Sequence, residues 1–259
     1  PVYSVEEEIA PSPLLGLTKA SIEVKDLWLK YRPTLPYVLQ GVSFTIEPGD
    51  RVGIIGRTGS GKTSLIQALF GLYPIEKGSI QINGVSPTDL RLFRQGISLI
   101  SQDPILFRGT LRENLHLSQN PKDEELFEIL KKVGLHSWAC TEGLNMLIEE
   151  KGKNLSMGER QLVCMARCLC QNTPIVIMDE ATSSVDPQSE DLLVSTTYSH
   201  FKDKTLILIA HRLTTLSLCN KVLWLEQGRV HKFDLAENIL SDHTLSDHFL
   251  SRKILSNIA

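Results

Sequence analysis

The amino-acid sequence predicts an α/β protein with a mainly parallel core sheet, an N-terminal antiparallel β subdomain and a helical insertion. Short, fully apolar runs alternate with helical patterns, as is typical of parallel strands buried on both faces, at residues 51–55, 175–178, 205–210 and 221–225. Apolar and polar residues alternate between 22 and 46, as in antiparallel strands with one buried face. A glycine-rich loop stands between the run at 51–55 and a helical pattern.

The N-terminal part is expected to hold a linker followed by strands. Residues 1–18 contain three prolines and an acidic run, which indicates a linker. An antiparallel hairpin is predicted within 22–46, where two prolines separate the strands. After a helix at 64–70, residues 79–83 alternate as another strand, and Asn83-Gly84 is a turn signal.

The middle and C-terminal parts are expected to be rich in helices. A short helix is predicted at 85–93 and a strand at 97–100. Residues 110–150 are predicted to be mostly helical, with one helix that begins at Asn120-Pro121 and carries acidic residues in its first turn. Further helices are predicted at 156–170, 187–198 and 213–218, and a helical tail after Leu235.

Composition excludes several classes of protein. The chain of 259 residues is 42% apolar and 22% charged, as in an ordinary globular protein. A net charge of −3 without a long Lys/Arg cluster argues against nucleic-acid binding. The five cysteines form no C-x-x-C pair, so small buried residues in a reducing compartment are expected rather than disulfides or a zinc site. No apolar run has the length of about 18 residues that spans a bilayer, and no signal peptide is expected.

The glycine-rich loop has the pattern G-x-x-x-x-G-K-[ST] that binds phosphate groups. It consists of Gly56, Arg57, Thr58, Gly59, Ser60, Gly61, Lys62 and Thr63, and Ser64 continues into the helix. Glycines let backbone N–H groups approach phosphate oxygens, and the helix N-terminus adds a partial positive charge. Lys62 is expected to contact the β- and γ-phosphates, and the Thr63 hydroxyl to bind Mg²⁺. The sequence therefore predicts a nucleoside-triphosphate site.

Two carboxylates follow the apolar run at 175–178. Ligands of open parallel sheets bind beyond the carboxyl ends of the strands, which is where Asp179 and Glu180 stand. Asp179 is the expected partner of Mg²⁺, through water, and Glu180 is placed to activate the attacking water as a general base. The alternative is that both carboxylates cap the helix that follows.

A further set of residues surrounds these motifs, namely Tyr31, Gln102, the string LSMGERQ at 155–161, Asp186 and His211. In this order they resemble the ATP-binding-cassette domain of ABC transporters, and the resemblance covers nearly all of residues 20–240. It implies a P-loop NTPase fold of the ABC-ATPase type, with a helical signature subdomain at about 110–170.

Within that family the chain is most similar to the second nucleotide-binding domain of the C subfamily, the multidrug-resistance-associated type. The similarity lies in the strings GRTGSGK from Gly56, QDPILFRGTLRENL from Gln102 and DEATSSVD from Asp179. First domains of that subfamily often lack the carboxylate that matches Glu180, so its presence favours a second domain.

The resemblance implies roles for three residues whose type alone would not suggest one. Tyr31 matches the aromatic residue that stacks on adenine, although an isolated Tyr would ordinarily cover a core. Gln102 matches the residue that touches Mg²⁺ and the attacking water, whereas a lone Gln is ordinarily a turn residue. His211 matches the histidine that contacts the γ-phosphate, whereas a lone His at a strand end is ordinarily structural. Trp28 and Tyr37 receive no role.

The signature segment departs from the family pattern. In the family, the residues matching Ser156 and Gly158 meet the γ-phosphate of ATP bound to the opposite nucleotide-binding domain. The string LSMGE stands where Leu-Ser-Gly-Gly-Gln is usual, so Glu159 is expected to weaken closure on ATP unless a cation such as Arg160 neutralises it. Asp186 matches a loop that crosses the dimer interface, and it also suits a helix N-cap.

The resemblance implies an ATP-binding and ATP-hydrolysing domain of an ABC-type membrane transporter, with ATP and Mg²⁺ as cofactors. Dimerisation with a second nucleotide-binding domain, in the same or a partner chain, would power substrate export through transmembrane domains. No nucleic-acid partner is expected, and the location is the cytosolic face of a membrane. The expected division is a linker at 1–18, the ATP-binding domain at 19–242 and a helical tail at 243–259.

Two other functions stay open at this point. One is a regulatory nucleotide-sensing domain that gates a channel or receptor with little hydrolysis; Glu159 favours it, and the complete set of catalytic side chains argues against it. The other is a soluble ABC ATPase that acts on nucleic acid or ribosomes. The single cassette and the acidic charge balance argue against that second alternative.

Overall fold

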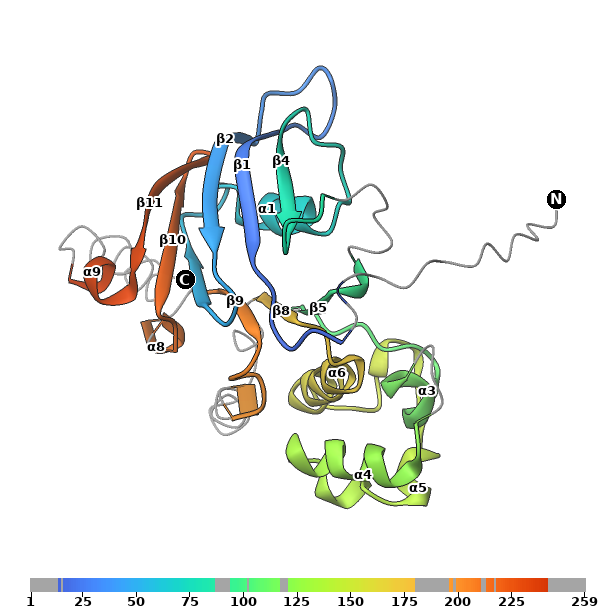
Figure 1. The fold of residues 1–259 in the computed structure, drawn as a ribbon. Coiled ribbons are helices and arrows are strands. Elements are labelled where there is room, and N and C mark those ends of the chain that lie inside the picture. The colour runs from blue at the N-terminus through green and yellow to red at the C-terminus, as the bar shows by residue number, and fades with distance from the viewer. Residues whose placement is uncertain are drawn as a thin grey trace, which may run out of the picture.

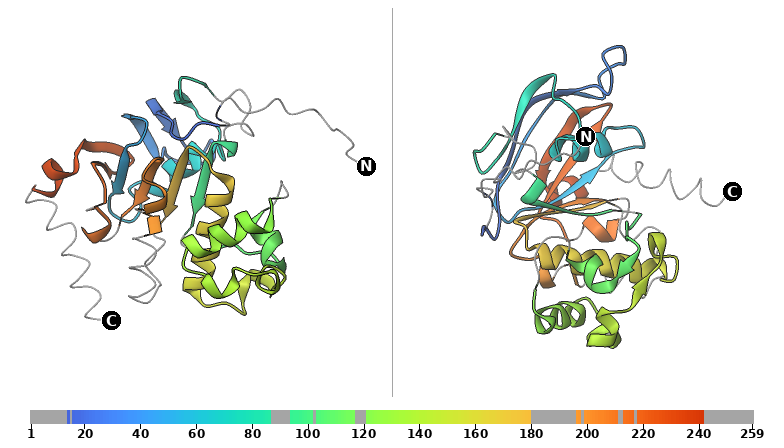
Figure 2. Two further views of the ribbon diagram at one scale, coloured as in Figure 1. Left: turned by 60° about the horizontal axis from the view of Figure 1, so that its bottom comes forward. Right: turned by 90° about the vertical axis from the view of Figure 1, so that its right-hand side faces the viewer.

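The computed structural model of the chain describes residues 14, 16–86, 94–101, 103–116, 121–179, 196–197, 199–210, 213–216 and 218–241. Within these residues a central sheet lies between an antiparallel sheet and a group of helices (Figure 1). Two further views show the same order of parts, with the helices from Leu111 to Gln171 gathered on one side (Figure 2). This layering confirms the predicted α/β fold class.

The central sheet has six strands in the described part of the chain. Their order is β11 (Arg229–Leu235), β10 (Lys221–Glu226), β3 (Arg51–Ile55), β9 (Thr205–Ile209), β8 (Ile175–Asp179) and β5 (Ile97–Ile100). Neighbouring strands are parallel except β10 and β11, which confirms the prediction of a mainly parallel sheet. The apolar pattern does not predict β11, because none of its residues is fully buried.

The antiparallel sheet consists of β2 (Leu39–Ile46), β1 (Ile22–Leu29) and β4 (Lys77–Ile82), in that order. Ile22 of β1 pairs with β2 on one side and with β4 on the other. The predicted hairpin and the predicted strand at 79–83 are therefore confirmed. The Asn83-Gly84 turn is confirmed as well, since these residues have φ values of 51° and 75°.

The helical part lies between β5 and β8. It contains α3 (Leu111–Leu115), α4 (Asp123–Lys132), α5 (Thr141–Leu144), α6 (Met157–Gln171) and the 3-10 turns η1 (His136–Trp138) and η2 (Glu150–Gly152). The mostly helical prediction is confirmed with two corrections. A short ladder joins β6 (Gly109–Thr110) to β7 (Leu147–Ile148), and α4 begins at Asp123 rather than at Asn120-Pro121.

The remaining helices are α1 (Lys62–Leu69), α8 (Leu213–Leu216) and α9 (Ala236–Leu240). The helix predicted at 85–93 is wrong at its start, because Val85 forms a β-bridge with Ile82. The rest of that helix lies almost wholly outside the described residues, as do most of the linker at 1–18, most of the helix at 187–198 and the tail at 243–259. None of the helices within the described ranges combines the length and apolar character needed to cross a membrane.

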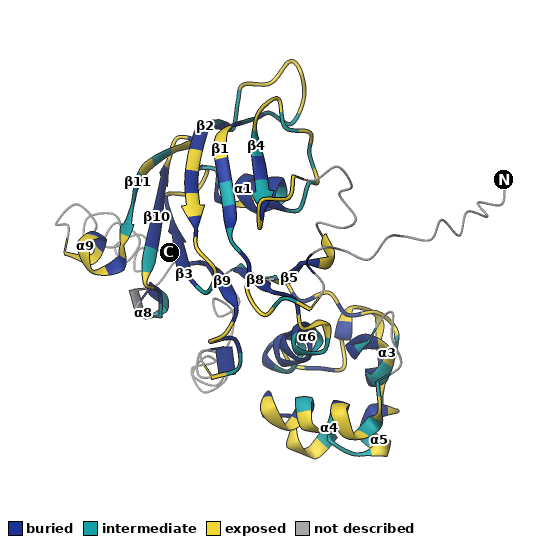
Figure 3. Ribbon diagram, in the orientation of Figure 1, coloured by how far each residue is buried: buried dark blue, intermediate teal, exposed yellow. Residues whose placement is uncertain are grey.

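Strands of the central sheet direct alternate side chains to opposite faces. In β8, Ile175 and Ile177 pack in the cluster that contains the antiparallel sheet and α1. Val176 and Met178 of the same strand pack in the cluster that contains α3, α4 and α6. Figure 3 shows the result, with buried residues along the central strands and exposed residues along α4. Both faces of the central sheet are covered, which explains why the sequences of these strands are continuous apolar runs.

The cysteines are free thiols, and most are buried. Cys164, Cys168 and Cys219 are buried as expected, whereas Cys140 and Cys170 are only half-buried. Burial raises the pKa of Cys168 and of Cys219 to about 12, so these two stay protonated and unreactive at neutral pH.

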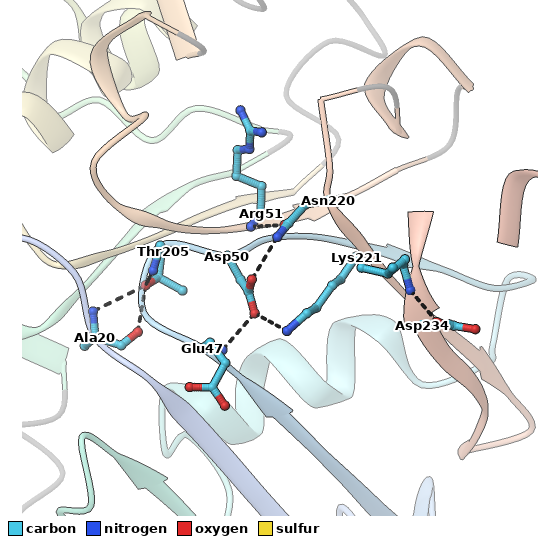
Figure 4. Close-up of polar contacts among 10 residues, drawn as sticks. Ala20, Glu47, Asp50, Arg51, Thr205, Asn220, Lys221 and Asp234 are labelled. Atoms are coloured by element: carbon cyan, nitrogen blue, oxygen red, sulfur yellow. Dashed lines mark hydrogen bonds and ion pairs between the residues drawn. The ribbon is translucent and has the colours of Figure 1, made fainter. Parts of the chain in front are cut away.

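Asp50 ties the start of β3 to β10 (Figure 4). Its Oδ2 accepts hydrogen bonds from Lys221 Nζ at 2.7 Å and from the Glu47 backbone N–H at 2.8 Å. Its Oδ1 accepts one from Asn220 Nδ2 at 2.8 Å. Burial raises the pKa of Asp50, but these hydrogen bonds outweigh burial and hold the pKa below its ordinary value. The carboxylate therefore stabilises the fold as an anion.

Asp50→Asn is expected to lower the free energy of unfolding at neutral pH by about 2 kcal/mol, because charge-assisted hydrogen bonds are lost. The folded pKa of Asp50 lies below its ordinary value of 3.8, so the contribution is present above that value. It is lost as the pH falls through the lowered folded pKa, and denaturant unfolding of both chains across pH measures this.

The matched control is Glu47→Gln, at an exposed carboxylate beside the same network. It should change the free energy of unfolding by less than about 0.5 kcal/mol. A difference between Asp50→Asn and the unmodified chain that stays constant down to acid pH would contradict this role of Asp50.

Candidate functional site

The phosphate-loop motif connects β3 to α1, as its sequence predicts. Gly61 is the N-cap of α1 and adopts φ 105°, a conformation that suits glycine. The first turn of α1 has no side-chain cap and no acidic residue. At Gly59, with φ 82°, a Cβ would meet no atom within 4 Å, so the backbone borders open space. The helix N-terminus is thus free to bind an anion.

Lys62 lies across the loop. Its side chain is buried, and Nζ donates to the carbonyl oxygens of Gly56 at 2.7 Å and Arg57 at 3.2 Å. The Ser60 Oγ is buried and has no hydrogen-bond partner within the described structure. A buried ammonium group, an uncapped helix N-terminus and an orphaned hydroxyl together fit a bound phosphate chain.

Asp179 ends β8 beside the loop. It pairs in register with Ile209 of β9, so the carboxyl ends of both strands meet at one edge of the sheet. Burial raises the pKa of Asp179, and the charge of Lys62 opposes this rise. The Thr63 hydroxyl and the Asp179 carboxylate border the same pocket, and such oxygen atoms are the ligands that Mg²⁺ prefers.

A pocket of about 530 Å³ joins the loop to the connection between β1 and β2. Predicted residues that line it are Tyr31, Thr58, Gly59, Gly61, Lys62, Thr63, Ser64 and Asp179. The remaining lining residues were not predicted from the sequence; they are Tyr37, Val38, Ile209, Gln227 and Gly228. Only Tyr37 and Val38 carried a signal, since they follow Tyr31 in the same connection. Gln227 and Gly228 come from the β10–β11 turn, which no chemical motif marks.

Tyr31 is held against α1. Its hydroxyl lies 2.7 Å from the Ser64 Oγ and donates to Gln67 Oε1 at 3.1 Å. The ring packs edge-on against Tyr73, with centroids 4.8 Å apart and an interplanar angle of 74°. The residue predicted to contact a base is therefore connected directly to α1, the helix that follows the phosphate-loop motif.

The β10–β11 turn is hydrogen-bonded to the phosphate loop and to β2. Gly228 N–H donates to the Ser60 carbonyl at 3.0 Å, and the Gly228 carbonyl accepts from Gln40 N–H at 2.8 Å. Gly228 has φ 77°, and a Cβ there would lie 2.4 Å from the Val38 carbonyl oxygen. A Cβ at Gly61 would lie 2.9 Å from Leu39 Cδ2. The loop, β2 and this turn are packed too closely for a side chain at either glycine.

The signature segment begins α6. Ser156 Oγ accepts from Glu159 N–H at 3.2 Å, and Glu159 Oε2 accepts from Ser156 N–H at 2.8 Å, which forms a capping box. Among the described residues, no direct ion pair joins Glu159 to Arg160. Neither Ser156 nor Gly158 lines the pocket described above.

Four predicted site residues lie outside the described residues, namely Gln102, Glu180, Asp186 and His211. Their roles stay predictions.

The fold and the site define a class, the P-loop proteins that bind nucleoside triphosphates. Comparison with known proteins gives the family. The model of the family described as "ABC transporter" matches residues 39–183. The chain therefore belongs to the ABC transporter family.

Two relatives, one of them a member of the C subfamily, are similar over most of the chain. It is 43% identical over 221 residues to ATP-binding cassette sub-family C member 10 of Mus musculus, covering 84% of this chain and 15% of that protein. It is 40% identical over 239 residues to the pleiotropic ABC efflux transporter of multiple drugs YBT1 of Candida glabrata, covering 85% of this chain and 14% of that protein. The chain thus spans a small part of the length of these relatives.

A solved structure has the same fold. The chain matches the structure of a bacterial Atm1-family ABC exporter with ATP bound, with a TM-score of 0.84 and 29% sequence identity. The match covers 95% of this chain and 44% of the exporter chain. This confirms the ABC-ATPase fold that the sequence predicted.

Gly228→Ala is expected to reduce both the stability of the chain and its affinity for MgATP, because the new methyl group pushes β2 away from the loop. The matched control is Gly84→Ala. Gly84 has φ 75°, and a Cβ at this position would meet no atom within 4 Å. The control should cost only backbone strain, about 1 kcal/mol, and leave MgATP affinity unchanged. Denaturant unfolding and calorimetric titration measure both quantities, and equal effects of the two substitutions would contradict the close packing at Gly228.

Proposed function

We propose that residues 19–242 form the ATP-binding and ATP-hydrolysing domain of an ABC-type transporter, in which dimerisation with a partner nucleotide-binding domain powers export. The observation that carries the proposal is the shared pocket of Lys62, Thr63, Asp179 and Tyr31 in a chain of this family. ABC domains bind ATP with Mg²⁺ as the accompanying ion, and the loop fits a triphosphate.

The loop would bind and orient the triphosphate. Backbone N–H groups at the start of α1 donate to phosphate oxygens, and Lys62 exchanges its carbonyl contacts for phosphate contacts. Thr63 and Asp179 would hold Mg²⁺, with Gln102 as a further ligand, and the bound ion supplies charge neutralisation on the phosphates. Because burial disfavours the charged form of the half-buried Asp179 carboxylate, a bound cation would offset that cost.

Hydrolysis would depend on side chains at the carboxyl ends of the central strands. Glu180 follows Asp179 and accepts the proton of the attacking water as general base. His211, just beyond β9, donates to a γ-phosphate oxygen. Register supports this assignment, since Asp179 of β8 pairs with Ile209 of β9 and both residues line the pocket. Tyr31 supports adenine as the base.

The pocket is proposed to be half of a composite site. Ser156 and Gly158 begin a 15-residue helix but line no part of this pocket, which supports their use on ATP bound to a partner domain. Asp186 is assigned to the same interface. The relatives at 43% and 40% identity support a domain of a membrane ABC transporter, at the cytosolic face of a membrane beside transmembrane domains. The carboxylate at Glu180 is the feature that favours a second, C-terminal domain of the C subfamily. The exporter match favours transport over a sensor that hydrolyses little.

Glu180→Gln is expected to keep MgATP binding and to reduce turnover by about 100-fold or more, because the general base is lost while the phosphate contacts stay. Phosphate release and calorimetric MgATP titration, with the partner nucleotide-binding domain present, measure the two properties separately. Undiminished hydrolysis by Glu180→Gln would overturn the assignment of the base.

Glu159→Gln is expected to increase MgATP-induced dimerisation with the partner domain, since it removes an anion from the signature. Glutamine also suits this position of a capping box, so the free energy of unfolding should change by less than about 1 kcal/mol. Light scattering at several MgATP concentrations measures dimerisation. Glu159→Ala, which removes the bond to Ser156 N–H, is the control for loss of the cap. Equal dimerisation of the glutamate and glutamine chains would rule out an effect of charge.

A further inference from the structure

We propose that Tyr37 is a second aromatic contact for the nucleotide base, held in position by Trp28 and Lys30. This inference rests on the proposed function, because it requires the pocket to bind a nucleotide. It adds a second aromatic residue of the β1–β2 connection to the pocket lining, where the sequence patterns pointed to Tyr31 alone.

Tyr37 and Tyr31 line the same pocket from the two ends of the β1–β2 connection. Both side chains are half-buried, so each has surface that a ligand can cover. The hydroxyl of Tyr31 is engaged by Ser64 and Gln67 on α1, which fixes that ring beside the phosphate loop. Tyr37 belongs instead to the β2 side of the pocket, next to Val38. A flat base has two faces that can contact an aromatic ring, and both tyrosines line the pocket.

The Tyr37 ring is contacted by the side chains of Trp28 and Lys30. Trp28 packs edge-on against it, with centroids 5.1 Å apart and an interplanar angle of 79°. Lys30 Nζ lies 5.2 Å from the centroid of the Tyr37 ring and forms an ion pair with Glu76 at 3.5 Å. The backbone is fixed as well, because the Tyr37 carbonyl accepts from Gln40 Nε2 at 3.3 Å.

Trp28 is itself held on several sides. Its Nε1 donates to Asp26 Oδ1 at 2.9 Å. Lys77 Nζ lies 5.6 Å and the Arg229 guanidinium carbon 5.8 Å from its ring. Tyr37 is therefore ordered before any ligand binds, and stacking on it costs little conformational entropy.

A structural role for Tyr37 predicts a different result from a base contact. If the ring only covered the sheet, its loss would affect every ligand of the pocket alike. A base contact would affect a nucleotide but not a triphosphate that lacks a base. MgATP and magnesium tripolyphosphate therefore serve as the pair of probes.

The experiment measures the affinity of the chain for both probes by calorimetry, in Tyr37→Leu, Tyr37→Phe and Lys62→Ala. Tyr37→Leu should weaken MgATP binding about tenfold, because one stacking contact is lost, and should leave tripolyphosphate binding unchanged. Tyr37→Phe keeps the ring and should stay within about twofold of the unmodified chain for both probes. Lys62→Ala should weaken both probes. Thermal unfolding establishes that each variant is folded.

Unchanged MgATP affinity in Tyr37→Leu, with Lys62→Ala weakened, would overturn the role of Tyr37 and leave the proposed function intact. Equal weakening of both probes in Tyr37→Leu would assign the residue a structural role and overturn the inference as well. If Lys62→Ala binds both probes as the unmodified chain does, the pocket is not the triphosphate site and the proposed function fails with it.

Discussion

The close approach of three backbone segments at Gly61 and Gly228 is the constraint on which the site depends. The phosphate loop, the start of β2 and the β10–β11 turn meet there, and Gly228 N–H donates to the Ser60 carbonyl at 3.0 Å. Neither glycine has room for a side chain. Because the turn also accepts from Gln40 N–H at 2.8 Å, the antiparallel sheet cannot shift without moving the loop. The end of the pocket that is proposed to bind the base and the end that is proposed to bind the phosphates are thereby held at a fixed separation.

The proposed function requires one chain to present two surfaces to two nucleotides, and the arrangement of the described elements is compatible with this. The pocket opens among the carboxyl ends of β3, β8 and β9, whereas Ser156 begins α6 in the helical part. The capping box gives Glu159 a structural use in this chain, as the acceptor of Ser156 N–H at 2.8 Å. The serine hydroxyl still has its own proton to donate. A carboxylate in the signature is therefore compatible with a well-formed N-terminus of α6. Its unfavourable effect is the electrostatic repulsion of an anion that approaches this N-terminus.

Sequence reasoning was most successful where one local signal decides the structure. β3, β8, β9 and β10 are buried on both faces, so continuous apolar runs identified them. The loop from Gly56 to Thr63 was identified because its chemistry demands fixed residues at fixed spacing. β11 was missed because it is a polar edge strand. The start of α4 was predicted too early, at Asn120-Pro121, because proline favours the first position of a helix, whereas the N-cap is Lys122. Gly228 was missed because tertiary contacts alone bring it to the pocket.

Backbone hydrogen exchange with and without MgATP can locate triphosphate binding, which is proposed for the amides of residues 56–64. MgATP is expected to slow exchange most in peptides that cover this loop and the first turn of α1. Weaker slowing is expected in peptides that contain residues 31–38 and the β10–β11 turn. If MgATP does not slow exchange in the loop, or slows it most in another part of the chain, the triphosphate does not bind at these amides.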